Sequence, residues 1–237
     1  MRLDEALVKK GLVDSRSKAK ELIKQSKIKV NSKIVTKPSY GVQDSDEIEL
    51  LQDKIYVSRA ALKLKNYITE TGFSFKNKSV LDIGASTGGF SEVALESGAK
   101  KVVCVDVGTN QLHERIKSDP RVENYEKTDF RDFEDNRKFD VILSDVSFIS
   151  LLKLIKNIDK YAKKDIILLF KPQFEVGKDA KRDKKGVVID TEAIKNARAN
   201  FEEECKKLGW RLVDSRESSI KGKEGNTEYV YHFKKES

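Results

Sequence analysis

The chain has 237 residues, 36% of them charged and 38% hydrophobic, and its 47 Lys and Arg against 39 Asp and Glu give a formal net charge of +8. This length suits one or two domains, and the apolar content is enough for a packed core, which excludes wholesale disorder. No apolar run approaches the roughly 18 residues of a transmembrane helix, and the charged N-terminus shows no secretory signal. The two cysteines lie far apart and only two histidines are present, so neither a disulfide framework nor a metal site is expected. We therefore expect a cytoplasmic protein with no membrane partner.

The positive charge is concentrated at the N-terminus. Residues 1–43 hold 11 Lys or Arg and 4 Asp or Glu, whereas the rest of the chain is nearly balanced. Apolar residues at helical spacing predict one helix that Gly11 ends and a second helix that Ser15 caps. Short strands are expected at 28–31, 34–35 and 48–50. In the second helix Arg16, Lys20 and Lys24 recur every four residues, so they form a basic ridge that indicates either an RNA contact or an ordinary solvated face.

A resemblance favours the RNA contact. The segment RLDEALVKKGLVDSRSKAKELIKQSKIKVNSKIV resembles the small RNA-binding module of a ribosomal small-subunit protein and of many pseudouridine synthases. Ser26 and Ser32 stand where that module usually has glycine. The resemblance implies a small α+β RNA-binding module over residues 1–53. Its expected RNA-binding residues are Arg2, Arg16, Lys18, Lys20 and Lys24.

The pattern changes after a connection expected at 54–60. Short apolar runs predict strands at 79–84, 102–106, 122–125, 139–143, 166–170, 211–218 and 228–233. Helices are expected at 90–97, 150–161 and 191–208 between them. Buried strands that alternate with helices indicate an α/β domain with a doubly wound, Rossmann-like, seven-stranded sheet over residues 61–237. Such sheets bind ligands at the carboxyl ends of their strands.

A glycine-rich loop follows the first of these strands. The loop reads Gly84-Ala85-Ser86-Thr87-Gly88-Gly89, and Asp106 stands 22 residues beyond Gly84, where a carboxylate binds a ribose diol. A nicotinamide enzyme would also place an acid there. The G-x-x-x-G-G spacing and Asp82 inside the strand favour S-adenosylmethionine instead, because a carboxylate suits a cationic amino group and repels a pyrophosphate. A structural turn without a ligand is the alternative.

Two further residues extend the predicted cofactor site. Asp129 is placed to hydrogen-bond an adenine amino group, and Phe130 either stacks on the ring or belongs to the core. The expected cofactor-binding residues are Asp82, Gly84, Ser86, Gly88, Phe90, Asp106, Asp129, Phe130 and Asp145.

The end of the fourth strand restricts the methyl acceptor. It reads Ser144-Asp145-Val146-Ser147-Phe148 and lacks the two prolines usual in enzymes that methylate exocyclic base nitrogens. Base C5 methylation needs a cysteine nucleophile near the cofactor, and neither cysteine is placed for it. An alternative chemistry is O-methylation of a ribose 2′-hydroxyl, which needs a proton acceptor or a nearby cation. Lys171 ends the fifth strand and would lie beside Asp145 in the usual strand order.

Five motifs in this order identify the chain as resembling a known family. YVSRAALKL, LDIGASTGGF, LSDVSF, LLFKPQFEVGK and GNTEYVYHF resemble the haemolysin-A/TlyA family of bacterial ribosomal-RNA 2′-O-methyltransferases, which are related to FtsJ. The resemblance implies a catalytic tetrad of Lys63, Asp145, Lys171 and Glu228. Lys171 would lie nearest the 2′-oxygen, as general base or as the cation that stabilises the alkoxide. Asp145 and Glu228 would orient it, and Lys63 would bind the substrate ribose or phosphate.

The resemblance also implies a substrate, a cytidine in ribosomal RNA within a ribosomal subunit. The large subunit is favoured because the chain begins directly at Arg2-Leu3-Asp4, and the small subunit stays open. Arg59, Lys178 and Arg182 are further RNA-binding candidates. The polar connection 171–186 is expected to be either a mobile lid or a disordered loop. A monomer and a weak dimer are both open, as are two other functions: a membrane-active haemolysin, or an RNA-binding protein with an inactive methyltransferase fold.

Overall fold

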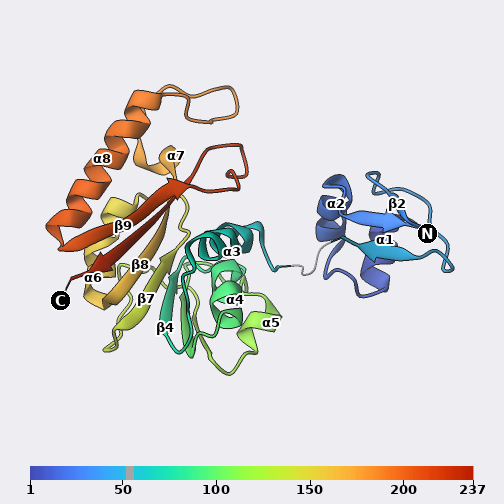
Figure 1. Ribbon diagram of the computed structural model, residues 1–237, viewed down its shortest axis with the longest axis horizontal. Helices are drawn as coiled ribbons and strands as arrows, with labels where there is room; N and C mark the ends of the chain where they lie inside the picture. The colour runs from blue at the N-terminus through green and yellow to red at the C-terminus, as the bar shows by residue number, and fades with distance from the viewer. Residues whose placement is uncertain (52–55, 237) are drawn as a thin grey trace. The chain divides into compact units, whose positions relative to one another are not determined.

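The computed structural model describes residues 1–51 and 56–236. The chain divides into two compact units, Met1–Ile55 and Tyr56–Ser237 (Figure 1). The boundaries expected from the sequence, 1–53, 54–60 and 61–237, stay a prediction, and their positions 52–55 lie outside the described residues. The helix that carries Lys63 begins at Arg59, inside the expected connection.

The first unit combines two helices with a small antiparallel sheet. Its elements are α1 (Leu3–Lys9), α2 (Arg16–Lys24), β1 (Ile28–Val30), β2 (Lys33–Ile34) and β3 (Ile48–Leu50), with strand order β2-β1-β3. The Ser15 hydroxyl accepts a hydrogen bond from Lys18 N and so caps α2, as predicted. Gly11 takes the left-handed φ of +67° just after α1. Leu7, Leu22 and Ile28 are fully buried in the core of this unit.

The second unit contains a seven-stranded sheet. Its strands are β4 (Ser79–Ile83), β5 (Lys101–Val105), β6 (Val122–Tyr125), β7 (Phe139–Ser144), β8 (Ala162–Phe170), β9 (Trp210–Glu217) and β10 (Tyr229–Lys235), in the order β6-β5-β4-β7-β8-β10-β9. The first five strands run parallel, and β10 is antiparallel to both β8 and β9. The expected doubly wound α/β class is confirmed, with two antiparallel strands at one edge.

Helices cover both faces of this sheet (Figure 1). The helical elements are α3 (Arg59–Thr71), α4 (Gly89–Glu96), α5 (Glu114–Lys117), the 3-10 turn η1 (Leu151–Lys153), α6 (Ile155–Tyr161), α7 (Pro172–Glu175) and α8 (Thr191–Lys207). α3, α4 and α5 pack on the face formed by Val80, Val102 and Val141. α6 and α8 pack on the opposite face, where Leu81 and Val103 lie. Successive strand residues therefore serve two different cores, which explains the continuous apolar runs.

Three segments differ from their expected form. β8 begins at Ala162, four residues before the expected strand, because Ala162 already pairs with Phe139 of β7. The exposed Lys163 and Lys164 lie at a register shift, and the pairing resumes at Asp165. The helix expected at 150–161 is divided into η1 and α6. The connection after Lys171 contains α7, whose first residue Pro172 needs no backbone donor there.

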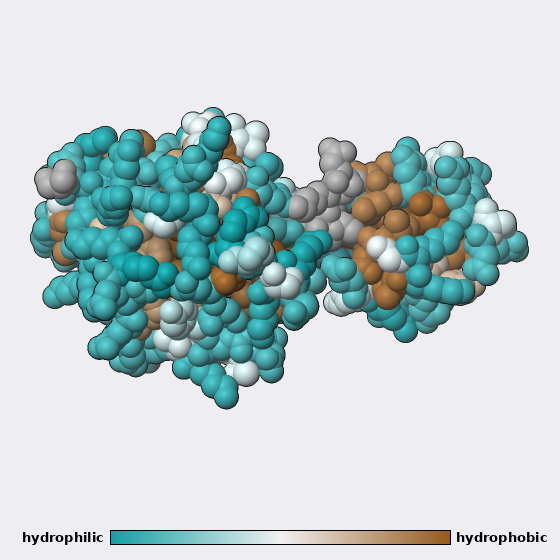
Figure 2. Space-filling model, turned by 90° about the horizontal axis from the view of Figure 1, so that it is seen from below, coloured by the Kyte–Doolittle hydropathy of each residue, from teal (hydrophilic) through white to brown (hydrophobic). Residues whose placement is uncertain are grey.

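The surface of the larger unit is mostly hydrophilic on the face shown in Figure 2. None of the helices formed by residues 1–51 and 56–236 combines the length and the apolar content that a membrane span requires. This agrees with the high proportion of charged residues in the sequence, 36%.

The carboxyl ends of β4, β5, β7 and β8 meet at one edge of the sheet. Strand order reverses between β4 and β7, and sheets of this kind bind ligands at such a reversal. The loops that follow these two strands approach each other closely, since a Cβ added to Gly84 would lie 2.9 Å from Val146 Cγ1. Tyr229 pairs with Phe170, so the start of the antiparallel strand β10 lies at the same edge. Residues from four strands and from α3 therefore reach one site.

Candidate active site at the carboxyl edge of the sheet

The glycine loop forms the floor of two adjoining cavities. A cavity of about 520 Å³ is lined by the residues after β4, β5, β6 and β7, among them Gly84, Ser86, Asp106, Asp129, Phe130 and Asp145. A smaller cavity of about 190 Å³ adjoins it, with Asp82, Gly84, Ser86, Phe90, Asp145 and Lys171 in its wall. Gly84 and Gly88 have φ values of +73° and +89°, which the absence of a Cβ permits.

Asp106, the predicted ribose-binding residue, forms hydrogen bonds with two loops. Its two carboxylate oxygens accept hydrogen bonds from the backbone N–H groups of Ser86, at 2.8 Å, and of Gly108, at 2.7 Å. Each oxygen has further lone pairs, so the carboxylate can still accept from a ribose diol. Asp106 thus joins the loop after β4 to the loop after β5 at the larger cavity.

Asp129 and Phe130 both line the larger cavity, but they contact different parts of the protein. The Arg131 guanidinium and backbone bind the carboxylate and lower the pKa of Asp129 to about 2. Phe130 is 5% exposed and packs against Phe133 and Tyr161 in the core. Of the two interpretations of Phe130, core packing is observed, and the residue also lines the cavity.

Asp82 is a buried acid in the wall of the smaller cavity. It is 1% exposed, and its Oδ2 accepts a hydrogen bond of 2.6 Å from Ser91 Oγ. Burial raises the pKa of Asp82 to about 7, with the neighbouring Asp145 carboxylate adding to the effect. A cation in this cavity would stabilise the ionised carboxylate.

Lys63, Asp145, Lys171 and Glu228 form one buried cluster, although they come from four different elements. Lys63 Nζ lies 2.6 Å from Glu228 Oε2 and 4.0 Å from Asp145 Oδ2. Lys171 Nζ lies 2.6 Å from Asp145 Oδ1, so Asp145 bridges the two lysines. Lys63, Lys171 and Glu228 are each less than 10% exposed. Two cations paired with two carboxylates balance the charge, as buried ionic groups require.

Lys171 has three acceptors around its ammonium group. Besides Asp145 Oδ1, its Nζ donates to the Asp145 carbonyl oxygen at 3.1 Å and to Ser147 Oγ at 2.9 Å. Ser147 lines both cavities, and sequence reasoning assigned it no role. Its position two residues after Asp145 is the only sequence signal that points to it.

Phe148 stands beside this cluster with its side chain in solvent. It is 92% exposed and adopts a φ of +66°, which is unusual for an aromatic residue. Its ring packs at 5.3 Å from that of Phe174 in α7. Phe148 also lines the larger cavity, where an exposed aromatic ring offers a flat apolar face.

The RNA-binding residues predicted in the first unit are at its surface, but several are also bound. Arg2 and Arg16 both pair with the buried carboxylate of Asp4, and these hydrogen bonds lower the pKa of Asp4 to about 2. The two guanidinium groups are still 45% and 50% exposed. Lys18 pairs with Glu21 on the same helix at 3.2 Å. Lys20 and Lys24 are exposed on α2, as the ridge pattern predicted.

The predicted RNA-binding residues of the second unit come from the start of α3 and from the connection between α7 and α8. Arg59 begins α3, and its Nη2 donates to the carbonyl of Lys221 at 3.1 Å. Arg182 is half-buried and donates to the carbonyl of Gln173 at 3.4 Å, whereas Lys178 is exposed.

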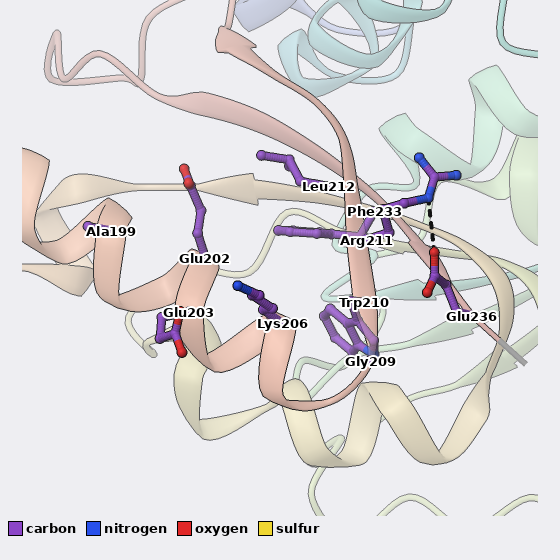
Figure 3. A pocket seen from close by; sticks show the side chains of 10 residues that line it. All are labelled: Ala199, Glu202, Glu203, Lys206, Gly209, Trp210, Arg211, Leu212, Phe233 and Glu236. Atoms are coloured by element: carbon purple, nitrogen blue, oxygen red, sulfur yellow. Dashed lines mark hydrogen bonds and ion pairs between the residues drawn. The ribbon is translucent and has the colours of Figure 1, made fainter.

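The lining of the two cavities fits S-adenosylmethionine. Asp82, Asp106 and Asp145 supply carboxylates for a ligand that carries an ammonium, a sulfonium and a ribose diol, and an anionic pyrophosphate would be repelled. A groove of about 580 Å³ also lies between α8 and the edge strand β9 (Figure 3). It contains none of the predicted site residues.

Sheet order, glycine loop and acidic cavity together define the class of S-adenosylmethionine-dependent methyltransferases. The chain belongs to the FtsJ-like methyltransferase family, whose model matches residues 56–235. An S4 domain model matches residues 1–48, which include both helices, β1, β2 and the first residue of β3 in the first unit.

Relatives align over nearly the whole chain. The 23S rRNA (cytidine-2′-O)-methyltransferase TlyA of Campylobacter jejuni is 48% identical over 98% of this chain and 99% of its own length. The 16S/23S rRNA (cytidine-2′-O)-methyltransferase TlyA of Mycobacterium tuberculosis is 36% identical over 96% of this chain and 87% of its own. A solved structure from Streptococcus thermophilus with a provisional hemolysin name is 32% identical and has a TM-score of 0.75, covering 99% of this chain and 88% of that chain.

Proposed function

We propose that this protein transfers a methyl group from S-adenosylmethionine to the 2′-hydroxyl of a cytidine in ribosomal RNA. The observation that carries the proposal is the buried cluster of Lys63, Asp145, Lys171 and Glu228 at the rim of the cofactor cavity. Bound S-adenosylmethionine supplies an electrophilic methyl group. Asp82 would hold its amino group, Asp106 its ribose, and the walls formed by Gly84 and Phe130 its adenosine.

Lys171 is the group that acts on the substrate hydroxyl. An alcohol becomes a good nucleophile only when its proton is accepted or its developing charge is stabilised. Nζ donates hydrogen bonds to two neutral oxygens, the Asp145 carbonyl and Ser147 Oγ, and forms an ion pair with Asp145 Oδ1. A substrate oxygen can take the place of Ser147, while Asp145 keeps the ammonium in position. Lys63, paired with Glu228, would bind the ribose or a neighbouring phosphate.

The base of the target nucleotide would be supported by Phe148. Its exposed ring lies beside the cluster, and unstacked bases in RNA are commonly held on aromatic side chains. Cytidine is proposed because both TlyA relatives carry it in their names. The large subunit is favoured because the Campylobacter relative, at 48% identity, is named for 23S rRNA alone. Such a substrate would place the enzyme in the cytoplasm.

The first unit would bring the catalytic unit to the RNA. The exposed lysines Lys20 and Lys24 and the guanidinium groups of Arg2 and Arg16 would contact phosphates, with Lys18 at the edge of this surface. Arg59 is the predicted contact at the start of α3. The S4 domain match supports this assignment.

The test is methyl transfer by Lys171→Ala. We expect the rate onto large ribosomal subunits that lack the modification to fall by about 10²- to 10⁴-fold, because the hydroxyl loses its activating group. S-adenosylmethionine binding, measured by calorimetry, should change little. Lys164→Ala is the matched control, since this lysine is exposed on the same strand.

Two results would contradict the proposal. Normal methylation by Lys171→Ala would remove the assigned mechanism. Lysis of erythrocytes by the purified protein, unchanged by Asp82→Asn, would instead favour the membrane-active alternative. Mapping ribose methylation in both ribosomal RNAs, with and without the protein, identifies the nucleotide.

A further inference from the structure

The connection between α7 and α8 contains an ordered hairpin. Over residues 181–189, Asp183 N donates to Val187 O at 2.9 Å and Ile189 N donates to Lys181 O at 3.0 Å, on either side of an Arg182–Val188 bridge. Gly186 closes the turn with a φ of +81°. We call residues 181–189 the arm.

The turn of the arm presents cations. Asp183 Oδ1 accepts hydrogen bonds from the backbone N–H groups of Lys185 and Val187, so its carboxylate is directed inward to fix the turn. Lys184 and Lys185 are exposed at the tip. Because the backbone that carries them is already ordered, a phosphate bound there would cost less conformational entropy than on a flexible loop.

Asn226 joins the arm to the β9–β10 loop, which leads to Glu228. Asn226 is 5% exposed, and its Oδ1 accepts a hydrogen bond of 2.9 Å from Val188 N. Its own carbonyl accepts from Gly222 N at 2.9 Å, and a Cβ on Gly222 would lie only 2.6 Å from Glu228 Oε1. The arm and the β9–β10 loop lie side by side in Figure 1.

The other side of the arm reaches the segment after Lys171. The Arg182 guanidinium donates to the carbonyl of Gln173, two residues beyond Lys171. The arm is therefore attached next to two members of the cluster, Glu228 through Asn226 and Lys171 through α7.

We propose that the arm is a preformed phosphate-binding element of the catalytic unit and that Asn226 is the positioning residue that holds it beside the cluster. The proposal rests on the proposed function, because its ligand is the RNA backbone that flanks the methylated ribose. It adds a second electrostatic contact, separate from the basic ridge of α2.

The first experiment removes the two tip lysines in the full-length protein. With large ribosomal subunits isolated without the modification, Lys184→Ala/Lys185→Ala should raise KM for the subunit about tenfold and leave kcat and cofactor affinity unchanged. Since two phosphate contacts are lost, the slope of log kcat/KM against log salt should become shallower by about 2. Lys206→Ala/Lys207→Ala is the control, with the same charge change at the far end of α8, about 22 Å along the helix.

The second experiment tests Asn226. Asn226→Ala leaves the buried N–H of Val188 unpaired and should release the arm, which gives the same increase in KM and the same shallower salt slope. Asn226→Asp keeps an acceptor oxygen for Val188 N and should restore most of the wild-type KM. Adding Asn226→Ala to the lysine pair should produce less than the product of the two effects, because both act through the arm.

The outcomes separate the arm from the function it rests on. The arm proposal is overturned if the wild type methylates the subunits and Lys184→Ala/Lys185→Ala has the same KM and the same salt slope as the Lys206→Ala/Lys207→Ala control. A lower melting temperature of Asn226→Ala without a change in KM or salt slope would make Asn226 merely structural and overturn its positioning role. If the wild type itself does not methylate ribosomal subunits, the proposed function fails and the arm proposal fails with it.

Discussion

Asp82 shows how burial and ligand chemistry are balanced at a single residue. The carboxyl group lies on the α4 face of β4, where Ser91 donates to one of its oxygens and water has little access. Burial disfavours the ionised form and raises the pKa to about 7. In the free protein the group is therefore protonated below this pH, and it carries a buried charge above it.

This balance predicts a pH dependence of cofactor binding. A ligand ammonium binds the ionised carboxylate, so S-adenosylmethionine should bind tightly above pH 7. Its affinity should weaken by up to about tenfold per pH unit below pH 7, because binding must then displace a proton. The dissociation constant measured by calorimetry between pH 5.5 and 8.5 checks this.

Asp82→Asn provides the comparison. The amide has no charge to titrate, so its affinity should be low and almost independent of pH over the same range. An unchanged pH profile in this variant would show that another group controls binding. In the absence of ligand the wild type should lose stability as pH rises from about 4 to 7, since the unfolded carboxyl ionises at lower pH than the folded one.

At the scale of elements, the β1–β2 turn shows a local compromise. Val30 pairs with Lys33, so Asn31 and Ser32 form a two-residue turn with φ values of 48° and 66°. Hairpin turns of this kind favour Asn-Gly, because both residues need positive φ. Ser26 likewise has a φ of 59°. The serines that replace the glycines of related modules thus keep the backbone shape at a conformational cost.

Replacing Ser32 by glycine should stabilise this hairpin. A left-handed conformation costs an L-residue about 1–2 kcal/mol, and glycine loses part of that gain through its greater unfolded-state entropy. We expect a net gain of about 0.5–1 kcal/mol. Hydrogen exchange at the amides of β1 should slow by roughly twofold to fivefold, since about 1.4 kcal/mol corresponds to tenfold.

Ser45→Gly is the control for this change. Ser45 lies in a turn of the same unit and has no positive φ. Glycine there should leave stability unchanged or lower it. If Ser32→Gly and Ser45→Gly slow hydrogen exchange at the β1 amides equally, the positive φ of Ser32 does not explain the gain in stability.

In the molecule as a whole, the excess positive charge and the methyltransferase fold belong to different units. Most of the net charge of +8 comes from residues 1–43, whereas the cluster of Lys63, Asp145, Lys171 and Glu228 pairs its own cations with carboxylates. The first unit is therefore expected to control affinity for RNA, and the second to control the rate of methyl transfer. The salt dependence of binding separates the two contributions.

Lys20→Ala/Lys24→Ala tests this division in the full chain. Loss of two phosphate contacts should weaken binding to ribosomal subunits and make the slope of log affinity against log salt shallower by about 2. The maximal rate at saturating subunit should stay near that of the wild type. Binding assays over a salt series give both quantities.

The matched control removes two exposed lysines at the opposite edge of the catalytic sheet. Lys76 and Lys100 precede β4 and β5, so Lys76→Ala/Lys100→Ala carries the same change in charge away from the cofactor cavity. If both pairs of substitutions alter the salt slope equally, net charge rather than the ridge of α2 governs binding.

Much of the fold was predictable from local patterns, because buried strands and capped helices leave periodic signals. The caps at Ser15 and Gly11, the strand Val122–Tyr125 and the order of strands and helices agree with those signals. The split of the 150–161 helix, the α7 turn and the arm were not foreseen. Each depends on contacts with distant residues, such as the bonds of Glu175 with Ser150 and Leu151.

By itself the sequence determined the class of sheet, the cofactor loop and the separation of a basic module from a nearly neutral catalytic unit. These features depend on periodicity, glycine spacing and charge, which are local properties. Only the tertiary structure decided that Lys63 meets Glu228 and that Asp145 lies between two lysines. The reason is topological: parallel strands and the antiparallel β10 bring residues 165 positions apart to one edge, and no local pattern encodes that distance.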